Sequence, residues 1–184
     1  LAPFTGCYAA LVDAKGKMQS DLFAYRLAEE ILIDFEPGYA GAVQSRLEKF
    51  IITEEVENAD ATPHFAHCTG QGPDAGGVAE TLGLPMPESK LAVAKADDSY
   101  VINQPRLDTS GFDLFVPVNE AEAIRQSLSN QAVRCSEAAF EKARVLATIP
   151  RFGVDLTEAH LPPEGSVLDQ CTRALSLIHI RRCR

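Results

Sequence analysis

The chain has 184 residues with 26 acidic and 17 basic side chains, a formal net charge of −9, and 46% hydrophobic residues. This composition is typical of a globular protein with a sizeable core, and so acidic a chain lacks the basic stripe needed to follow nucleic-acid phosphates. The five cysteines form no CxxC pair and no apolar run reaches the roughly 18 residues of a membrane span, so we expect a cytoplasmic protein without a metal site, a membrane or a nucleic-acid partner.

The first 50 residues predict three antiparallel strands followed by a helix. Apolar runs over residues 6–12, 18–26 and 31–35 are separated by short polar turns, which indicates a meander. Residues 39–50 then carry apolar side chains at helical spacing, with basic residues near the end where the helix dipole favours cations. We therefore expect an amphipathic helix packed on an antiparallel sheet.

The rest of the chain predicts a second set of strands and three more helices. Strands are expected over residues 54–59, 64–68, 91–96, 99–103 and 112–118, and helices over 74–82, 120–128 and 136–148. Asn119 is the predicted cap of the second of these helices, and Asp97 and Asp98 form a predicted tight turn. Strands in runs with helices segregated among them indicate an α+β fold of two related lobes of antiparallel sheet, residues 1–88 and 89–176.

Three charged residues are candidates for binding a ligand. Asp21 lies within a predicted strand, where a carboxylate is unfavourable unless it faces solvent or a site. Arg144, late in the last predicted helix, either faces water and complements the helix dipole or anchors the loop that follows. Arg106, in a predicted loop, is either an ordinary loop cation or a ligand to an anionic tail. From the residues alone, these features support only an α+β domain with a small-molecule cleft.

Two other motifs are weaker. His64 and His67 lie beside Cys68, but a strand would place the two histidines on opposite faces, so a metal cluster is not expected. The glycines between residues 70 and 77 match neither a Walker A loop nor a dinucleotide fingerprint, and we interpret them as a strand-to-helix turn. After the last predicted helix, Pro150 and Gly153 predict an ordered turn over residues 149–156.

Four segments resemble the folate-binding YgfZ family, whose members are relatives of the glycine-cleavage aminomethyltransferase. Residues 1–26 (LAPFTGCYAALVDAKGK, running into SDLFAYR) are similar to its opening G-x-Y-A-A-L-L-D-x-K-G-K … D-L-x-V-Y-R. Residues 144–155 (RVLATIPRFGVD) resemble its R-I-E-A-G-I-P-R-F-G-x-D segment. Residues 112–117 are similar to its G-x-D-L-x-V-P strand, and residues 173–176 resemble its R-A-I-S segment.

The resemblance implies paired α+β lobes around a central folate cleft, with tetrahydrofolate as cofactor and iron–sulfur enzymes as clients. Asp21 falls near the acidic position that orients the folate. The family's later signature, K-G-C-Y-x-G-Q-E, contains its most characteristic reactive cysteine and is absent from this sequence. We therefore expect a fragment that lacks native residues before Leu1 and the C-terminal barrel portion, with residues 177–184 as a non-native tail, and we assign no catalytic residue.

Two departures from the aminomethyltransferase pattern favour an accessory role over turnover. The glutamate that contacts the pterin in that enzyme is Leu146 here, and the asparagine after its third strand falls at Glu36. A buried Leu146 could not accept the pterin N–H groups, which would cost on the order of 1 to 3 kcal/mol. The expected function is therefore tetrahydrofolate binding in support of iron–sulfur cluster assembly or repair. A folate-dependent aminomethyltransferase is the first alternative, and a non-catalytic scaffold or partner-binding module is the second.

Overall fold

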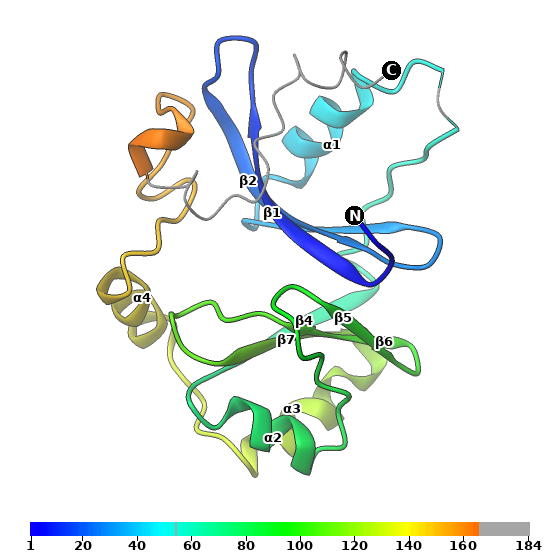
Figure 1. Ribbon diagram of the computed structural model, residues 1–184, viewed down its shortest axis with the longest axis vertical. Helices are drawn as coiled ribbons and strands as arrows, with labels where there is room; N and C mark the ends of the chain where they lie inside the picture. The colour runs from blue at the N-terminus through cyan, green and yellow to red at the C-terminus, as the bar shows by residue number, and fades with distance from the viewer. Residues whose placement is uncertain (54, 166–184) are drawn as a thin grey trace. The chain divides into compact units, whose positions relative to one another are not determined.

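The computed structural model describes residues 1–53 and 55–165, which divide into two compact units, each with its own antiparallel sheet (Figure 1). Within the described ranges, the first unit comprises Leu1, residues 6–60 and residues 150–165. The second unit comprises residues 2–5 and 61–149. None of the helices in these described residues is long and apolar enough to cross a membrane.

The first unit contains a three-stranded sheet in the order β1-β2-β3, and the predicted meander is confirmed. Its elements are β1 (Thr5–Val12), β2 (Met18–Arg26), β3 (Ile31–Phe35), α1 (Ala40–Glu48) and a 3-10 turn (Pro162–Gly165). The register pairs Leu22 with Phe35 and Phe23 with Asp34. Helix α1 is shorter than the predicted 39–50 and fully buries only Val43.

The two faces of this sheet pack into separate apolar clusters, as alternation along a strand requires. Ala9, Leu11 and Leu22 form one cluster. On the other face, Tyr8 and its neighbours at alternate positions of β1 pack against Phe152. A segment that follows the second unit in sequence therefore completes the core of the first unit.

The turn predicted over residues 149–156 is confirmed, and it is held in the first unit by close packing. Phe152 is 2% exposed and meets the Tyr39 ring edge-on with the centroids 5.2 Å apart. Gly153 has φ +84°, and an added Cβ would lie 2.6 Å from the Tyr39 hydroxyl oxygen. Glycine is needed here both for the backbone conformation and for the close approach.

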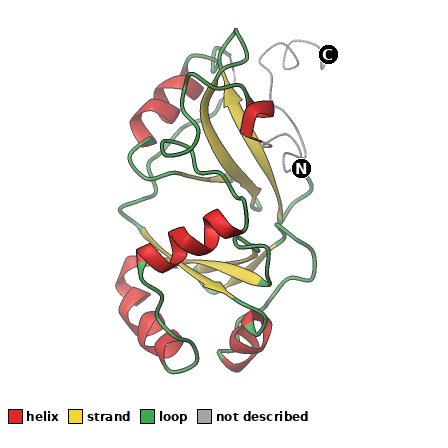
Figure 2. Cartoon of the chain, turned by 90° about the vertical axis from the view of Figure 1, so that its left-hand side faces the viewer, coloured by secondary structure: helices red, strands yellow, loops and turns green. Residues whose placement is uncertain are grey.

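The second unit contains a four-stranded sheet in the order β4-β7-β6-β5, with every neighbouring pair antiparallel. Its elements are β4 (Phe65–Gln71), α2 (Ala75–Thr81), β5 (Val93–Ala96), β6 (Ser99–Asn103), β7 (Gly111–Pro117), a 3-10 turn (Val118–Glu120), α3 (Ala121–Ser129) and α4 (Glu137–Leu146). Helices α2 and α3 lie on the same face of the sheet (Figures 1 and 2). They cover Phe112, Leu114 and Val116 of the central strand β7.

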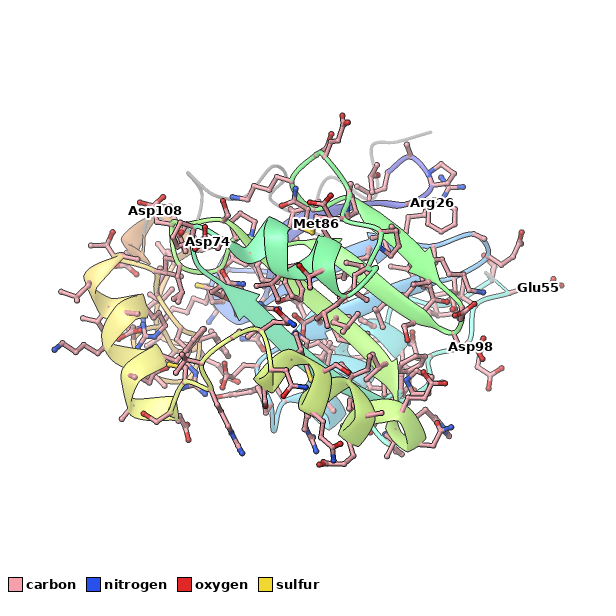
Figure 3. The ribbon with its side chains drawn as sticks, turned by 90° about the horizontal axis from the view of Figure 1, so that it is seen from below. Arg26, Glu55, Asp74, Met86, Asp98 and Asp108 are labelled. Atoms are coloured by element: carbon pink, nitrogen blue, oxygen red, sulfur yellow. The ribbon has the colours of Figure 1, made fainter. Side chains whose placement is uncertain are left out.

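Several local expectations hold in this unit. Asp98 lies at the tip of the β5–β6 hairpin, in the predicted turn (Figure 3). Ser136, the first residue of the helix predicted over residues 136–148, caps α4 because its hydroxyl accepts the Ala139 N–H at 3.3 Å. The position of the expected lobe boundary is different. The proline-rich loop near residue 88 connects α2 to β5, and both elements belong to the second unit, so the boundary expected between residues 88 and 89 lies inside that unit.

Two local predictions were wrong. Residues 55–59 form no strand, because Val56 is 59% exposed and the acidic side chains around it have no sheet face to cover. Asn119 does not cap α3, because the chain enters that helix through a 3-10 turn and the residue at the cap position is Glu120. The expected tail, residues 177–184, lies outside the described residues.

Candidate functional site

A partly buried carboxylate next to aromatic rings is the most distinctive polar feature of the first unit. Asp21 lies on β2, and the Tyr8 hydroxyl on β1 donates a hydrogen bond of 2.6 Å to its Oδ2. The Tyr8 ring packs on Phe23 with the centroids 4.8 Å apart, and Phe23 stacks on Tyr25 at 6.3 Å. Alternation along β2 places Asp21, Phe23 and Tyr25 on one face, so the carboxylate stands at the end of an aromatic row.

Two further carboxylates influence Asp21 from the neighbouring strand. The β2–β3 register ends at the pair Leu22–Phe35, so Glu36 follows β3 directly, at the end of the sheet where Asp21 lies. Asp34 pairs with Phe23, which alternation places on the same face as Asp21. Burial raises the pKa of the Asp21 carboxyl above its usual range, and the charges of Glu36 and Asp34 raise it further, while the bond from Tyr8 lowers it. A carboxyl perturbed in this way is typical of a functional site.

Glu36 is itself held by an arginine from the turn. Arg151 Nε donates to Glu36 Oε2 at 3.0 Å, and Arg151 Nη2 donates to Glu36 Oε1 at 2.5 Å. This bidentate pairing fixes the position of the Glu36 carboxylate and compensates its charge. The backbone N–H of Arg151 is bound in turn by Asp155 Oδ2 at 2.9 Å, and the adjacent Phe152 anchors the segment in the core.

Arg106, in the second unit, pairs with a fully buried carboxylate. Its Nε lies 3.0 and 2.8 Å from the two oxygens of Asp113, and its Nη2 lies 2.5 Å from Oδ2. His67 stacks on Phe115 and places Nε2 3.4 Å from the same Oδ2. Burial alone would raise the pKa of Asp113, but Arg106 and His67 together hold it below its usual range.

Arg144 anchors the loop that follows its helix, which is the second of the two roles considered for it. The residue is 6% exposed, and its Nη1 donates to the Ile149 carbonyl at 2.7 Å. Its Nη2 also pairs with Glu141 at 2.7 Å. The expectation that Leu146 is buried was wrong, because that side chain is 75% exposed. Side chains two residues apart on a helix project in nearly opposite directions, so a helix that buries Arg144 exposes Leu146.

The candidate residues therefore lie in different surroundings. Asp21 is grouped with Tyr8, Glu36 and Arg151 in the first unit, whereas Arg106 and Arg144 each have separate partners in the second. Tyr8 and Arg151 were missed as site residues, although both lie in the segments that carry the family resemblance. Within the described ranges, no three His, Cys, Asp or Glu side chains form a group able to hold a metal ion.

Comparison with known proteins supports the fold. No protein-family model matches the sequence. The structure is similar to the crystal structure of glycine cleavage system aminomethyltransferase T from Bartonella henselae, with 24% sequence identity and a TM-score of 0.77 over 88% of this chain. The match covers 46% of that protein, so this chain spans under half of its length. The predicted α+β fold with antiparallel sheets, related to that of the aminomethyltransferase, is confirmed.

Proposed function

We propose that this chain binds tetrahydrofolate on the Tyr8 face of the first unit and acts as an accessory factor for iron–sulfur enzymes. The observation that carries the first part is the Asp21 carboxylate, bound by Tyr8 beside an aromatic row. The second part rests on the resemblance to the YgfZ family. The similarity to an aminomethyltransferase fold supports a folate ligand without distinguishing the two roles.

The residues present fit a pterin. A pterin is a flat aromatic ring with N–H donors along one edge, and it requires a carboxylate or carbonyl acceptor at that edge and an apolar surface against the ring. Asp21 supplies the acceptor, with its orientation fixed by the bond from Tyr8. The ring of Phe23, only partly buried, supplies apolar surface close to that acceptor. The bound folate would contribute one-carbon carrier chemistry, which no side chain provides.

The two arginines have less direct roles in this proposal. The guanidinium of Arg106 is 22% exposed beside Asp113 in the second unit, and it remains our candidate for binding an anionic tail of a ligand. Arg144 holds the Ile149 carbonyl, and thereby fixes the chain just before the turn that carries Arg151. We therefore expect Arg144 to influence binding through the backbone.

Isothermal titration with tetrahydrofolate tests the folate assignment. We expect binding to the unmodified chain, and a loss of at least tenfold in affinity for Asp21→Asn, because the neutral amide is a weaker acceptor for N–H donors. Asp98→Asn, at the hairpin tip of the second unit, is the matched control and should bind normally. No heat from the unmodified chain at millimolar ligand would refute the proposal.

The iron–sulfur role needs a separate test in cells. This sequence lacks the K-G-C-Y-x-G-Q-E signature, so we expect no rescue of iron–sulfur enzyme activity by this chain in a strain without a YgfZ protein. A chimera that joins residues 1–176 to the signature and C-terminal portion of a YgfZ protein should rescue, and its Asp21→Asn form should not. Equal rescue by both chimeras would contradict a role for the folate site.

Aminomethyl transfer is the second candidate, and two observations favour it. The similar structure is an aminomethyltransferase, and the exposure of Leu146 removes the argument that a buried apolar side chain replaces the pterin acceptor. An assay of methylene-tetrahydrofolate formation distinguishes the candidates. Turnover by the chimera, abolished by Asp21→Asn, would favour the enzyme over the accessory factor.

A further inference from the structure

We propose that Arg151 is a positioning residue for the candidate site: by pairing with Glu36 it neutralises the carboxylate that faces Asp21, and so keeps Asp21 available as a charged hydrogen-bond acceptor. The relevance of this arrangement to folate rests on the proposed function. The electrostatic coupling among the three side chains does not, because it follows from their arrangement in the ligand-free chain.

The geometry places Glu36 between Asp21 and Arg151. The β2–β3 register ends at the pair Leu22–Phe35, so Asp21 and Glu36 are the next residues along their two chains, and the charge of Glu36 acts on Asp21. Arg151 then binds both oxygens of Glu36 through separate nitrogens. Arg151 is separated from Glu36 by 115 residues in sequence, and the buried Phe152 beside it keeps the guanidinium in place.

The balance of charge around Asp21 explains why such a partner is needed. Tyr8 faces Asp21 from β1, Asp34 and Glu36 face it from β3 and its end, and Arg151 reaches Glu36 from the turn. Three carboxylates thus share one sheet face, and neighbouring like charges oppose ionisation. Pairing Glu36 with a guanidinium reduces this repulsion without occupying Asp21 itself. The Asp21 oxygens therefore remain able to accept bonds from a ligand.

A purely structural role is the competing explanation, in which Arg151 only fixes the turn. The two explanations differ in how Asp21 titrates when Arg151 is replaced and the turn remains folded. If Arg151 acts by compensating the charge of Glu36, its removal should raise the pKa of Asp21, and removing both charges should return that pKa towards its original value. If Arg151 only fixes the turn, Asp21 should titrate as in the unmodified chain in every Arg151 variant whose turn remains folded.

The experiment is an NMR titration of the Asp21 carboxyl in the ligand-free full chain, with carbon-13-labelled aspartate. Arg151→Gln should raise the pKa of Asp21, Glu36→Gln should lower it, and the double variant should have a pKa close to that of the unmodified chain. Arg151→Lys keeps the charge and should shift it least. An unchanged Asp21 in Arg151→Gln, or equal shifts in the single and double variants, would overturn the proposal.

Two further measurements separate this proposal from the folate assignment. Thermal unfolding of each variant shows whether the turn remains folded, and the Glu36→Gln variant tests the coupling even if Arg151→Gln unfolds. In tetrahydrofolate titrations between about pH 5 and 8, affinity should fall on acidification, because protonated Asp21 is a poorer acceptor. For Arg151→Gln this fall should begin at a higher pH than for the unmodified chain. The predicted NMR shifts without folate heat in any variant would support the coupling and refute the folate assignment alone.

Discussion

Removing Arg106 should reveal how strongly the second unit depends on a single buried charge. Asp113 is 0% exposed, and among the described residues its carboxylate is bound by Arg106 at 2.5 to 3.0 Å and lies 3.4 Å from His67 Nε2. Breaking a buried pair by deleting one partner leaves an uncompensated charge and typically costs about 3 to 5 kcal/mol. We expect Arg106→Gln to lower the free energy of unfolding near neutral pH by that amount.

The stability difference between Arg106→Gln and the unmodified chain should depend on pH in a definite direction. In the unmodified chain, Arg106 and His67 hold the pKa of Asp113 below its usual value of 3.8. Its contribution to stability is therefore present above that value and is lost as the pH falls through the folded-state pKa. Without Arg106, burial dominates and should raise the pKa of Asp113 above that of the unfolded chain. The stability gap between the two proteins should therefore widen as the pH rises and narrow on acidification.

Urea unfolding at several pH values measures both effects. Arg125→Gln is the matched control, because Arg125 makes an exposed ion pair with Glu122 at 3.7 Å, and such pairs contribute about 0 to 1 kcal/mol. The double variant Arg106→Gln/Asp113→Asn should recover part of the loss, since it removes the buried charge. Equal stabilities for Arg106→Gln and Arg125→Gln, or a gap that does not change with pH, would refute the reasoning.

Three further predictions concern the first unit. Phe152→Ala should lower the free energy of unfolding by about 3 to 5 kcal/mol in urea titrations, because Phe152 is 2% exposed in the core; a loss below about 1 kcal/mol would contradict its role there. Gly153→Ala should cost more than Gly38→Ala in the same assay, because both glycines have positive φ, at roughly 1 to 3 kcal/mol of strain, but only Gly153 also meets a side chain; equal costs would argue against the close contact. Tyr8→Phe should raise the pKa of Asp21 further in the NMR titration, because it removes the hydrogen bond that lowers this pKa and leaves burial, which raises it. The free energy of unfolding should then fall more steeply as the pH rises from 3.8 through the folded-state pKa. An unchanged pKa would exclude the Tyr8 bond.

Local pattern was enough to predict most of the elements, because alternation and helical spacing record which face of each segment is buried. The three strands of the first unit follow from apolar runs broken by polar turns, and the Ser136 cap follows from its side-chain chemistry. The same reasoning failed for residues 55–59. A weak alternation there predicts a strand, but a strand also needs a neighbouring strand to pair with, and the pattern of one segment does not identify that neighbour.

The candidate site was harder to predict because its contacts are distant in sequence. Asp21 was recognisable as an acidic residue in a strand, but the pairing of Arg151 with Glu36 spans 115 residues and depends on a turn that returns to the first sheet. Asp113 also gave a local signal, since a charge inside the run Gly111–Pro117 is unusual, yet its partner Arg106 is defined only once the loop has folded. The burial of Arg144 rather than Leu146 depended on which helix face packs inward.

The fully buried Asp113 and the partly buried Asp21 differ in a way that favours Asp21 as the functional carboxylate. Asp113 accepts bonds from Arg106 on both oxygens and lies beside His67, so its acceptor capacity is used within the protein and its charge is fully compensated. Among the described residues, Tyr8 alone donates a side-chain hydrogen bond to Asp21, and that bond is to one oxygen. Arg151 binds Glu36, whose charge acts on Asp21, and so compensates the charge near Asp21 only indirectly. A site for a ligand rich in N–H donors requires a carboxylate like Asp21, whose charge is compensated indirectly and whose oxygens can still accept hydrogen bonds. Asp113, which Arg106 binds directly, instead stabilises the fold.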